Sequence, residues 1–313
     1  MKFLQYLTEK LIVINGTKGK KYGNVIILAG GAASGKGFAV ANFMEGNLYK
    51  IRDIDEVKTL FLKIAELKDK YPEIRGLDLS RADDVGKLHQ FITLKKIKNK
   101  TFDLLMKDVR PGQLPNILFD ITFRDLKAAN FHWIKMMIDE LGYNPLDINL
   151  VWILTDYTLA VKQNRDPKRG RVVPDNILLG THEGAAVNMV NVIKGRVPQT
   201  NDKSLFNGSI HIILNNREHT LYWADSEGNV TSDPSKAIMT KPSQEKIDLH
   251  KKTKGKKGAI PQPVIKDFKY LTVKEKGKPI ISNEDILKQL FDWIKKNAPI
   301  TLDIDKVLKY GEK

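Results

Sequence analysis

The first 230 residues alternate between short apolar runs and longer stretches in which apolar residues recur at helical spacing. The apolar runs predict five strands, at residues 25–29, 49–54, 117–119, 148–154 and 209–214. The helical spacing predicts helices over 55–68, 83–107 and 124–141, and another that ends near Lys194. Strands alternating with helices imply right-handed crossovers and a mainly parallel sheet covered on both faces. In such sheets ligands collect at the carboxyl ends of the strands.

The pattern changes after Ser232. Before it, two short strands at 220–223 and 229–231 flank a turn at 225–228 and predict a hairpin. Residues 233–262 are rich in proline and lysine, which is typical of a flexible basic linker. A last amphipathic helix is predicted to start at Ser282, with Asp285 completing a capping box. We therefore expect an α/β domain over 1–232, a linker over 233–262 and a small C-terminal helical extension over 263–313.

Composition narrows the class of partner. Hydrophobic residues make up 42% of the 313 residues, enough for a sizeable core, and the net charge is +15. Such a charge favours anionic partners, namely nucleic acid or nucleotides, although a lysine-rich source would give the same excess. The chain has no cysteine, which excludes disulfides and zinc–thiolate sites and fits a reducing, cytoplasmic location. Neither a signal peptide nor a membrane span is predicted.

The strongest motif is a phosphate-binding loop, the P-loop, formed by Gly30, Gly31, Ala32, Ala33, Ser34, Gly35 and Lys36. It follows a buried strand and precedes a helix, the context in which backbone N–H groups and a helix N-terminus bind a nucleoside triphosphate. Gly37 replaces the usual Ser or Thr that binds magnesium, and Phe38 follows it. We therefore expect ATP or GTP with Mg²⁺, the ion being held by Ser34, by a carboxylate or through water. The alternative is a glycine-rich turn with a chance lysine.

Carboxylates follow the second and third predicted strands. Asp53 and Asp55 alternate in an extended segment, so both can face the phosphate end and act as a base or hold magnesium. Capping of the following helix is the alternative function of Asp55. Asp120 closes the third strand in a Walker-B-like arrangement. Thr122 and Arg124 follow it, where they can contact an acceptor, and helix capping is the alternative for Asp120 and Thr122.

A basic loop at 164–174 is the second strongest feature. Its arginines, Arg165, Arg169 and Arg171, are candidates for stabilising charge on a transferring γ-phosphate. A mobile loop of this kind, here called the lid, could close over the nucleotide and exclude water. The alternative is a solvated basic loop.

Together these motifs resemble zeta-toxin-type P-loop kinases and, more distantly, polynucleotide kinases, over about residues 20–225. The chain departs from the family at Gly37 and at Ile121, where glycine is usual. The resemblance implies an ATP-dependent phosphotransferase in which Lys36 binds phosphate and Asp53 or Asp55 is the base. It also implies that Asp120, Thr122 and Arg124 contact the acceptor, and that Arg165 or Arg171 stabilises the transition state.

Two functions remain open at this stage. The first is a kinase that moves a γ-phosphate to a hydroxyl of a nucleotide sugar or of a nucleic-acid or nucleotide group. The second is a nucleotide-dependent nucleic-acid-binding protein without phosphoryl transfer, favoured by the net charge and by Gly37. In either case the basic tail, residues 233–313, is the expected contact with nucleic acid.

Overall fold

The structure is a computed structural model of the whole chain. It describes residues 22–44, 49–106, 109–110, 112–125, 128–196, 207–215, 222–224, 226–227, 238–240, 269–280 and 283–309. Contacts between residues divide the chain into two compact units. The larger comprises residues 19–36, 47–216 and 270–313, and the smaller comprises 1–18, 37–46 and 217–269.

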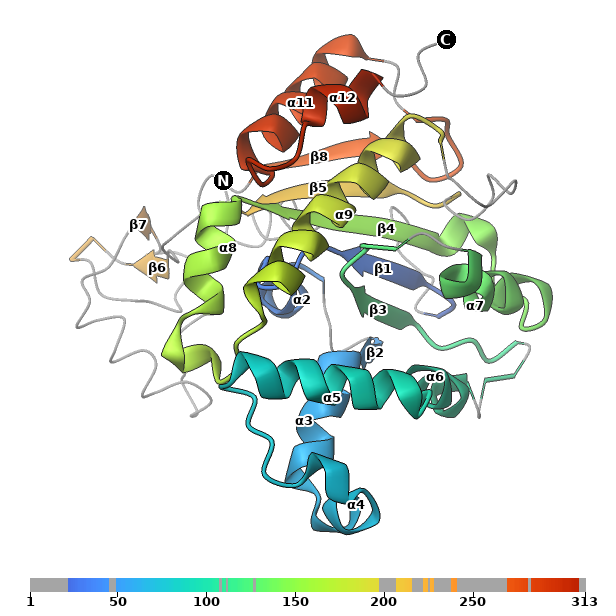
Figure 1. Ribbon diagram of the computed structural model, residues 1–313. Helices are drawn as coiled ribbons and strands as arrows, with labels where there is room; N and C mark the ends of the chain where they lie inside the picture. Colours follow the sequence, from blue (N-terminus) through green and yellow to red (C-terminus); the bar gives the residue numbers. More distant parts are fainter. Residues whose placement is uncertain are drawn as a thin grey trace. The chain divides into compact units, whose positions relative to one another are not determined.

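A six-stranded sheet with the order β2-β3-β1-β4-β5-β8 organises the larger unit (Figure 1). The pairs β2–β3, β3–β1, β1–β4 and β4–β5 are all parallel. The predicted α/β class and mainly parallel sheet are therefore confirmed. The bounds of the strands are β1 Val25–Ala29, β2 Lys50–Asp53, β3 Ile117–Ile121, β4 Ile148–Thr155, β5 Ile210–Asn215 and β8 Lys269–Lys274.

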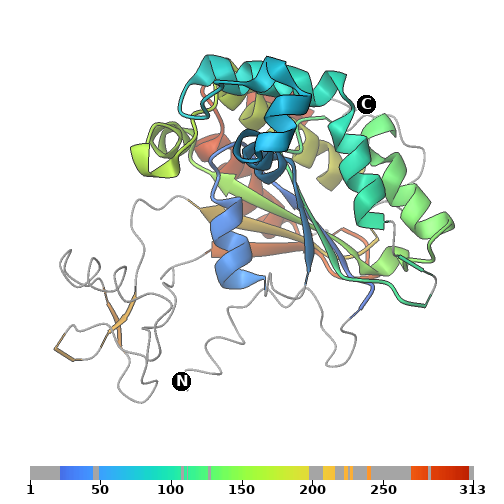
Figure 2. The same ribbon diagram turned by 90° about the horizontal axis from the view of Figure 1, so that it is seen from below.

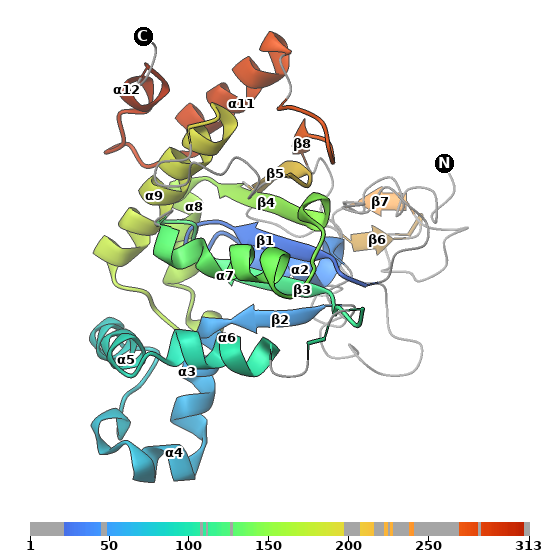
Figure 3. The same cartoon turned by 90° about the vertical axis from the view of Figure 1, so that its right-hand side faces the viewer.

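The helices of the larger unit lie along the two edges and over one face of this sheet. Figures 1 and 3 show α3–α6 at the β2 edge and α11 and α12 at the β8 edge, and Figure 2 shows α3 and α5 from below. Their bounds are α3 Ile54–Lys63, α4 Ala65–Lys70, α5 Ala82–Leu94, α6 Ile97–Met106, α7 Ala128–Asp139, α8 Tyr157–Asn164, α9 Asp175–Ile193, α11 Glu284–Asn297 and α12 Ile304–Lys309. Short 3₁₀ turns occur at Pro72–Ile74, Pro145–Asp147 and Pro167–Arg169.

Two predicted helices are each broken in two. The helix expected over 55–68 divides at Ile64, whose extended backbone separates α3 from α4. The helix expected over 83–107 divides after α5, because Lys96 takes a left-handed conformation with φ 52°. Lysine has good helix propensity, so tertiary structure overrides the local preference at this break.

The main hydrophobic core lies on one face of the sheet. Alternate residues of each central strand point into it, for example Val25 and Ile27 of β1 and Leu150 and Trp152 of β4. Helices α6, α7, α9 and α11 contribute the facing side chains. All eight residues of β4 are buried, as expected for a central strand of a parallel sheet.

The C-terminal residues belong to this same unit. The sequence predicts five strands and a small extension at 263–313, but β8 adds a sixth strand beside β5. Val273 of β8 and Leu290 and Ile294 of α11 are buried in the main core. The N-cap of α11 is Asn283, whose side chain accepts from the backbone N–H groups of Asp285 and Ile286, whereas Ser282 lies outside the described residues.

Helix α2 (Lys36–Phe43) begins at the last P-loop residue, and its residues 37–43 belong to the smaller unit, which also contains two short strands. β6 (Tyr222–Ala224) pairs antiparallel with β7 (Ile238–Thr240). The predicted hairpin partner at 229–231 lies outside the described residues, and β7 falls within the predicted linker at 233–262. The lysine run of that linker also lies outside the described residues. No helix in the described part of the chain is long and apolar enough to cross a membrane.

Candidate functional site

The P-loop lies at the carboxyl end of β1, between the ends of β3 and β4. Gly30, Ala33 and Gly35 have φ of 155°, 59° and 89°, so three of the seven loop residues take a positive φ. A Cβ on Gly30 would lie 2.7 Å from Ser34 Oγ and 2.9 Å from the Ile153 carbonyl oxygen. The tight turn therefore requires glycine at position 30, as expected for a loop that wraps its backbone around an anion.

Four side chains from β4, β5 and α9 hydrogen-bond to the backbone of the P-loop, and no sequence motif marks any of them. Thr155 Oγ1 and Asn215 Nδ2 both donate to the Ser34 carbonyl oxygen, at 2.7 and 2.8 Å. Thr181 Oγ1 accepts from the Ala32 N–H at 3.0 Å, and His182 Nε2 donates to the Ala32 carbonyl oxygen at 2.8 Å. Thr155 and Asn215 end β4 and β5, so a polar residue after each apolar strand was the available signal.

Lys36 lies at the centre of the site. Its Nζ donates to the carbonyl oxygens of Gly30 and Gly31, at 2.9 and 3.2 Å, and lies 3.6 Å from Asp120 Oδ1. Burial raises the pKa of Asp120 to about 6; Lys36 opposes this rise, and Asp53 and Asp55 add to it. Asp120 is thus a carboxyl that titrates near neutrality beside the P-loop lysine, which is a common property of functional sites.

The two carboxylates of the second strand have different environments. Asp53 is the N-cap of α3 and accepts from the Asp55 N–H at 2.7 Å, so the capping residue is Asp53 rather than Asp55. Asp55 instead pairs with Lys58 and with Arg171 of the lid, each at 2.9 Å. Burial raises the pKa of Asp55, but Arg171 and Lys58 outweigh this effect and lower it to about 2.

The lid is held in a defined conformation. Asn164 is fully buried; its Nδ2 donates to the Val173 carbonyl oxygen, and its Oδ1 accepts from the Val173 N–H and from Arg169 Nη1. Arg169 lies beside Arg171; burial, with Arg171, lowers its pKa to about 10. Arg165 points elsewhere, because its guanidinium pairs with Asp175 at 2.9 Å in an exposed position. The structure thus brings Arg169 and Arg171, but not Arg165, to Asp55.

The residues after β3 lie against α9. Thr122 is half-buried, next to the end of the strand. Phe123 takes a positive φ of 57°, and its carbonyl oxygen accepts from Asn188 Nδ2 of α9 at 2.9 Å. Arg124 lies across α9, since a Cβ on Gly180 or Gly184 would meet its side chain at 3.3 or 2.8 Å.

Further cations surround Asp55 on the side of α3, α5 and α6. Arg52 Nη2 donates to the Lys98 carbonyl oxygen at 2.6 Å. Burial lowers the pKa of Lys98, and the charges of Lys58 and Arg52 lower it further. Burial also lowers the pKa of His89, as do the charges of Lys58, Lys98 and Arg124. We call Arg52, Lys58 and Lys98 the basic cluster; no sequence motif marks it, because its members come from three separate elements.

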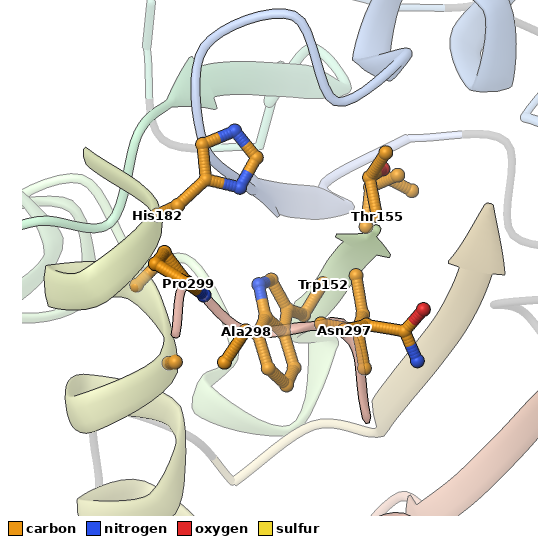
Figure 4. A pocket seen from close by; sticks show the side chains of 11 residues that line it. Trp152, Thr155, His182, Asn297, Ala298 and Pro299 are labelled. Atoms are coloured by element: carbon orange, nitrogen blue, oxygen red, sulfur yellow. The ribbon is translucent and has the colours of Figure 1, made fainter. Parts of the chain in front are cut away.

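The described residues contain no group of three His, Asp or Glu side chains that could hold a metal ion by themselves. Ser34 Oγ is buried without a hydrogen-bond partner, and Asp53 and Asp120 are register partners on β2 and β3. The other two residues expected to bind nucleotide, Gly37 and Phe38, follow Lys36 in α2. A small cavity of about 10 Å³, lined by residues that include Gly31, Trp152, His182 and Pro299, lies behind the P-loop (Figure 4). It has room for about one water molecule.

Comparisons with known proteins show likeness only among solved structures. No protein-family model and no curated protein matches the chain. A structure from the PezAT chromosomal toxin–antitoxin system of Streptococcus pneumoniae covers 80% of this chain and 92% of its own, at 17% identity and a TM-score of 0.40. AvrRxo1-ORF1:-ORF2 with ATP covers 92% and 74%, at 14% and 0.38. Deoxyadenosine kinase from M. mycoides with bound dATP covers 58% and 91%, at 13% and 0.30. A structure from a toxin–antitoxin system and a structure of a nucleoside kinase are thus among those that this chain resembles.

Proposed function

We propose that this chain is an ATP- or GTP-dependent phosphotransferase that moves the γ-phosphate to a hydroxyl of a phosphate-bearing acceptor. One observation carries the proposal. Arg171 of the lid reaches Asp55 at 2.9 Å, while Lys36 of the P-loop lies 3.6 Å from Asp120. A phosphate-binding lysine, a lid arginine and two carboxylates therefore meet at the carboxyl ends of β1, β2 and β3. Phosphoryl transfer needs such a set, because catalysis depends on positioning and on cations around the transferring group.

In this proposal the nucleotide binds along residues 30–38. The backbone N–H groups of the loop and the N-terminus of α2 bind the phosphates. The Lys36 ammonium group releases its hydrogen bonds to the two loop carbonyl oxygens and donates to phosphate oxygens instead. Arg169 and Arg171 stabilise the charge that spreads over the γ-phosphate, and Arg165 is left out of the site because it pairs with Asp175.

The acceptor hydroxyl is assigned to Asp55, which orients it and accepts its proton. Thr122 and Arg124 lie beyond the end of β3, where they can contact the same molecule. The basic cluster supports an acceptor that carries phosphate, since its three cations lie close enough together to lower the pKa of Lys98 and a group of cations attracts anions. A nucleotide sugar and a nucleic-acid end both satisfy this chemistry. The lysine-rich segment at 233–262 favours the second of these.

Asp53 and Asp120 are better candidate ligands for magnesium than Ser34. Ser34 is a poor ligand, because its hydroxyl is buried and faces the position where Gly30 would carry a Cβ. Asp53 and Asp120 at the ends of β2 and β3 can hold the ion directly or through water. Mg²⁺ in nucleotide sites commonly uses one or two carboxylates together with phosphate oxygens. The ion would neutralise charge on the β- and γ-phosphates.

A transfer assay with labelled γ-phosphate tests this function. ATP and GTP are offered with nucleosides, nucleotides, sugar nucleotides, and DNA and RNA ends as acceptors. We expect transfer to at least one phosphate-bearing acceptor, and its loss in Lys36→Met, Asp55→Asn and Arg171→Ala. Arg75→Ala removes an exposed ion pair with Asp69 and is the matched control. Nucleotide binding without transfer to any acceptor would contradict the kinase and favour a nucleotide-dependent nucleic-acid-binding protein.

A further inference from the structure

His182 of α9 contacts the P-loop directly, although no sequence motif includes it. The residue is 7% exposed, and its Nε2 lies 2.8 Å from the Ala32 carbonyl oxygen. The neighbouring Thr181 accepts from the N–H of the same residue. Two consecutive residues of one helix thus engage both peptide groups that flank the Cα of Ala32. Figure 4 shows His182 reaching from α9 toward the loop.

The same ring leaves no room for a side chain at Gly31. A Cβ at this position would lie 2.3 Å from Cδ2, 2.4 Å from Nε2 and 2.5 Å from Cγ of His182. Real Cβ atoms do not approach other atoms so closely. Unlike Gly30 and Gly35, Gly31 has no positive φ, so its backbone conformation is open to other residues. The imidazole ring therefore accounts for the glycine at position 31.

The surroundings fix the ring and its tautomer. A carbonyl oxygen can only accept, so Nε2 carries the proton and Nδ1 is the acceptor nitrogen. Burial lowers the pKa of His182 to about 4, which keeps the ring neutral near pH 7. The Tyr157 ring packs edge-on against it, with centroids 5.4 Å apart. On another side, Trp152 and Pro299 line the small cavity that His182 also borders.

We propose that His182 is a positioning residue for the nucleotide: it holds the Gly31–Ala32 backbone in the conformation that binds the triphosphate. The inference rests on the proposed function of the P-loop and adds an element to it. Helix α9 also carries the Gly180 and Gly184 positions against which Arg124 lies, and it follows the lid directly. The same helix therefore aligns the P-loop with the residues assigned to the acceptor and to the γ-phosphate.

The first test compares His182→Gln with His182→Leu. The amide Nε2 of glutamine can reach the Ala32 carbonyl oxygen, whereas leucine fills space without a donor. One lost hydrogen bond corresponds to about a fivefold to tenfold change in an equilibrium constant. We expect the Leu variant to bind ATP about fivefold to tenfold more weakly, and the Gln variant to stay within about threefold of the parent protein. Adenosine has no phosphates, so its affinity should be the same in all three proteins.

A merely structural role would lower the melting temperature and weaken ATP and adenosine alike. That pattern would overturn the proposal, as would full ATP affinity in the Leu variant. Failure of the unsubstituted protein to bind either ATP or GTP would contradict the proposed function itself, and a protein that binds only GTP is tested with GTP and guanosine instead. Normal ATP binding that is insensitive to His182 contradicts only the positioning role.

The second test is a double-substitution cycle, which stays informative even if the Leu variant does not fold. Gly31→Ala alone should weaken ATP binding by about tenfold or more, because the new methyl group collides with the ring. In a His182→Ala background the same change should cost less than about threefold, since the ring has gone. Equal losses in both backgrounds would mean that position 31 must be glycine for the phosphate, and the proposal would be wrong.

Discussion

Asp120→Asn should stabilise the folded protein above about pH 6 while it impairs the proposed reaction. Burial raises the pKa of Asp120 from 3.8 to about 6, despite the neighbouring Lys36. One pKa unit corresponds to about 1.4 kcal/mol, so the ionised carboxylate costs the folded state about 3 kcal/mol relative to the unfolded chain. The side chain is only 19% exposed, and solvent therefore relieves little of this cost.

The sign of the pH dependence follows from the higher pKa in the folded state. Relative to the Asn variant, the parent protein is most stable below about pH 3.8, where Asp120 is protonated in both states. The free energy of unfolding of the parent protein falls as the pH rises from about 3.8 through about 6, and the fall is complete about one pH unit above the folded-state pKa. The two proteins should therefore unfold at similar urea concentrations near pH 4. Near pH 8 the variant should have the larger free energy of unfolding, by about 3 kcal/mol.

Urea unfolding followed by tryptophan fluorescence between about pH 4 and pH 8 measures this difference. Asp69→Asn is the matched control, because Asp69 is 77% exposed and its replacement should change stability by less than about 0.5 kcal/mol at every pH. An Asn variant at position 120 that is less stable than the parent near pH 8 would refute the reasoning. A gain that does not vary with pH would refute it as well, since a packing effect does not titrate.

Three further predictions concern the lid and the sheet, and two of them include a matched control substitution. Arg171→Ala should lower kcat in the transfer assay by about a hundredfold or more, while Arg165→Ala should stay within about threefold, because only Arg171 reaches Asp55; similar losses in both would contradict the assignment. Asn164→Leu should cost about 2–4 kcal/mol in urea unfolding, since it leaves both backbone groups of Val173 unpaired; a neutral effect would mean that the lid is not held by this residue. Gly208→Ala should lower the free energy of unfolding by about 2 kcal/mol or more, because its Cβ would lie 2.0 Å from the Ile148 carbonyl oxygen. Gly86→Ala in α5 is the control: no described atom lies within 4 Å of its Cβ, so it should be neutral or stabilising in the same assay.

The central strands could be predicted because their side chains are uniformly apolar. β1 and β4 are buried along their whole length, and the runs at 25–29 and 148–154 match them within one residue. The sequence does not predict β8, because its apolar residues Tyr270, Leu271 and Val273 form a short run that Thr272 interrupts and that lysines flank on both sides. Its place in the sheet depends on pairing with β5, which is more than fifty residues away along the chain.

The candidate site was predictable where one motif contains all of its parts, and not where it is assembled from several elements. The position of the P-loop after β1 follows from local sequence alone. The choice between Asp53 and Asp55 as helix cap depends on a boundary shift of two residues, which sequence patterns do not resolve. The lid arginines are close in sequence, yet Asn164 turns Arg169 inward and leaves Arg165 outside. Only the buried environment of Asn164 distinguishes the two.

Without a nucleotide, the cations of the site contact its own carbonyl and carboxylate oxygens. These contacts must break before the proposed reaction can begin. Lys36 contacts two carbonyl oxygens of its own loop and Asp120, and Arg171 contacts Asp55. A bound triphosphate would compete for both cations. When Arg171 turns to the γ-phosphate, Asp55 loses one of the two neighbouring cations that pair with it and lower its pKa, and its pKa must rise from about 2 toward the ordinary range. A carboxylate with a higher pKa accepts a hydroxyl proton more readily. In the proposed function, Asp55 therefore becomes an effective base only when the nucleotide is in place.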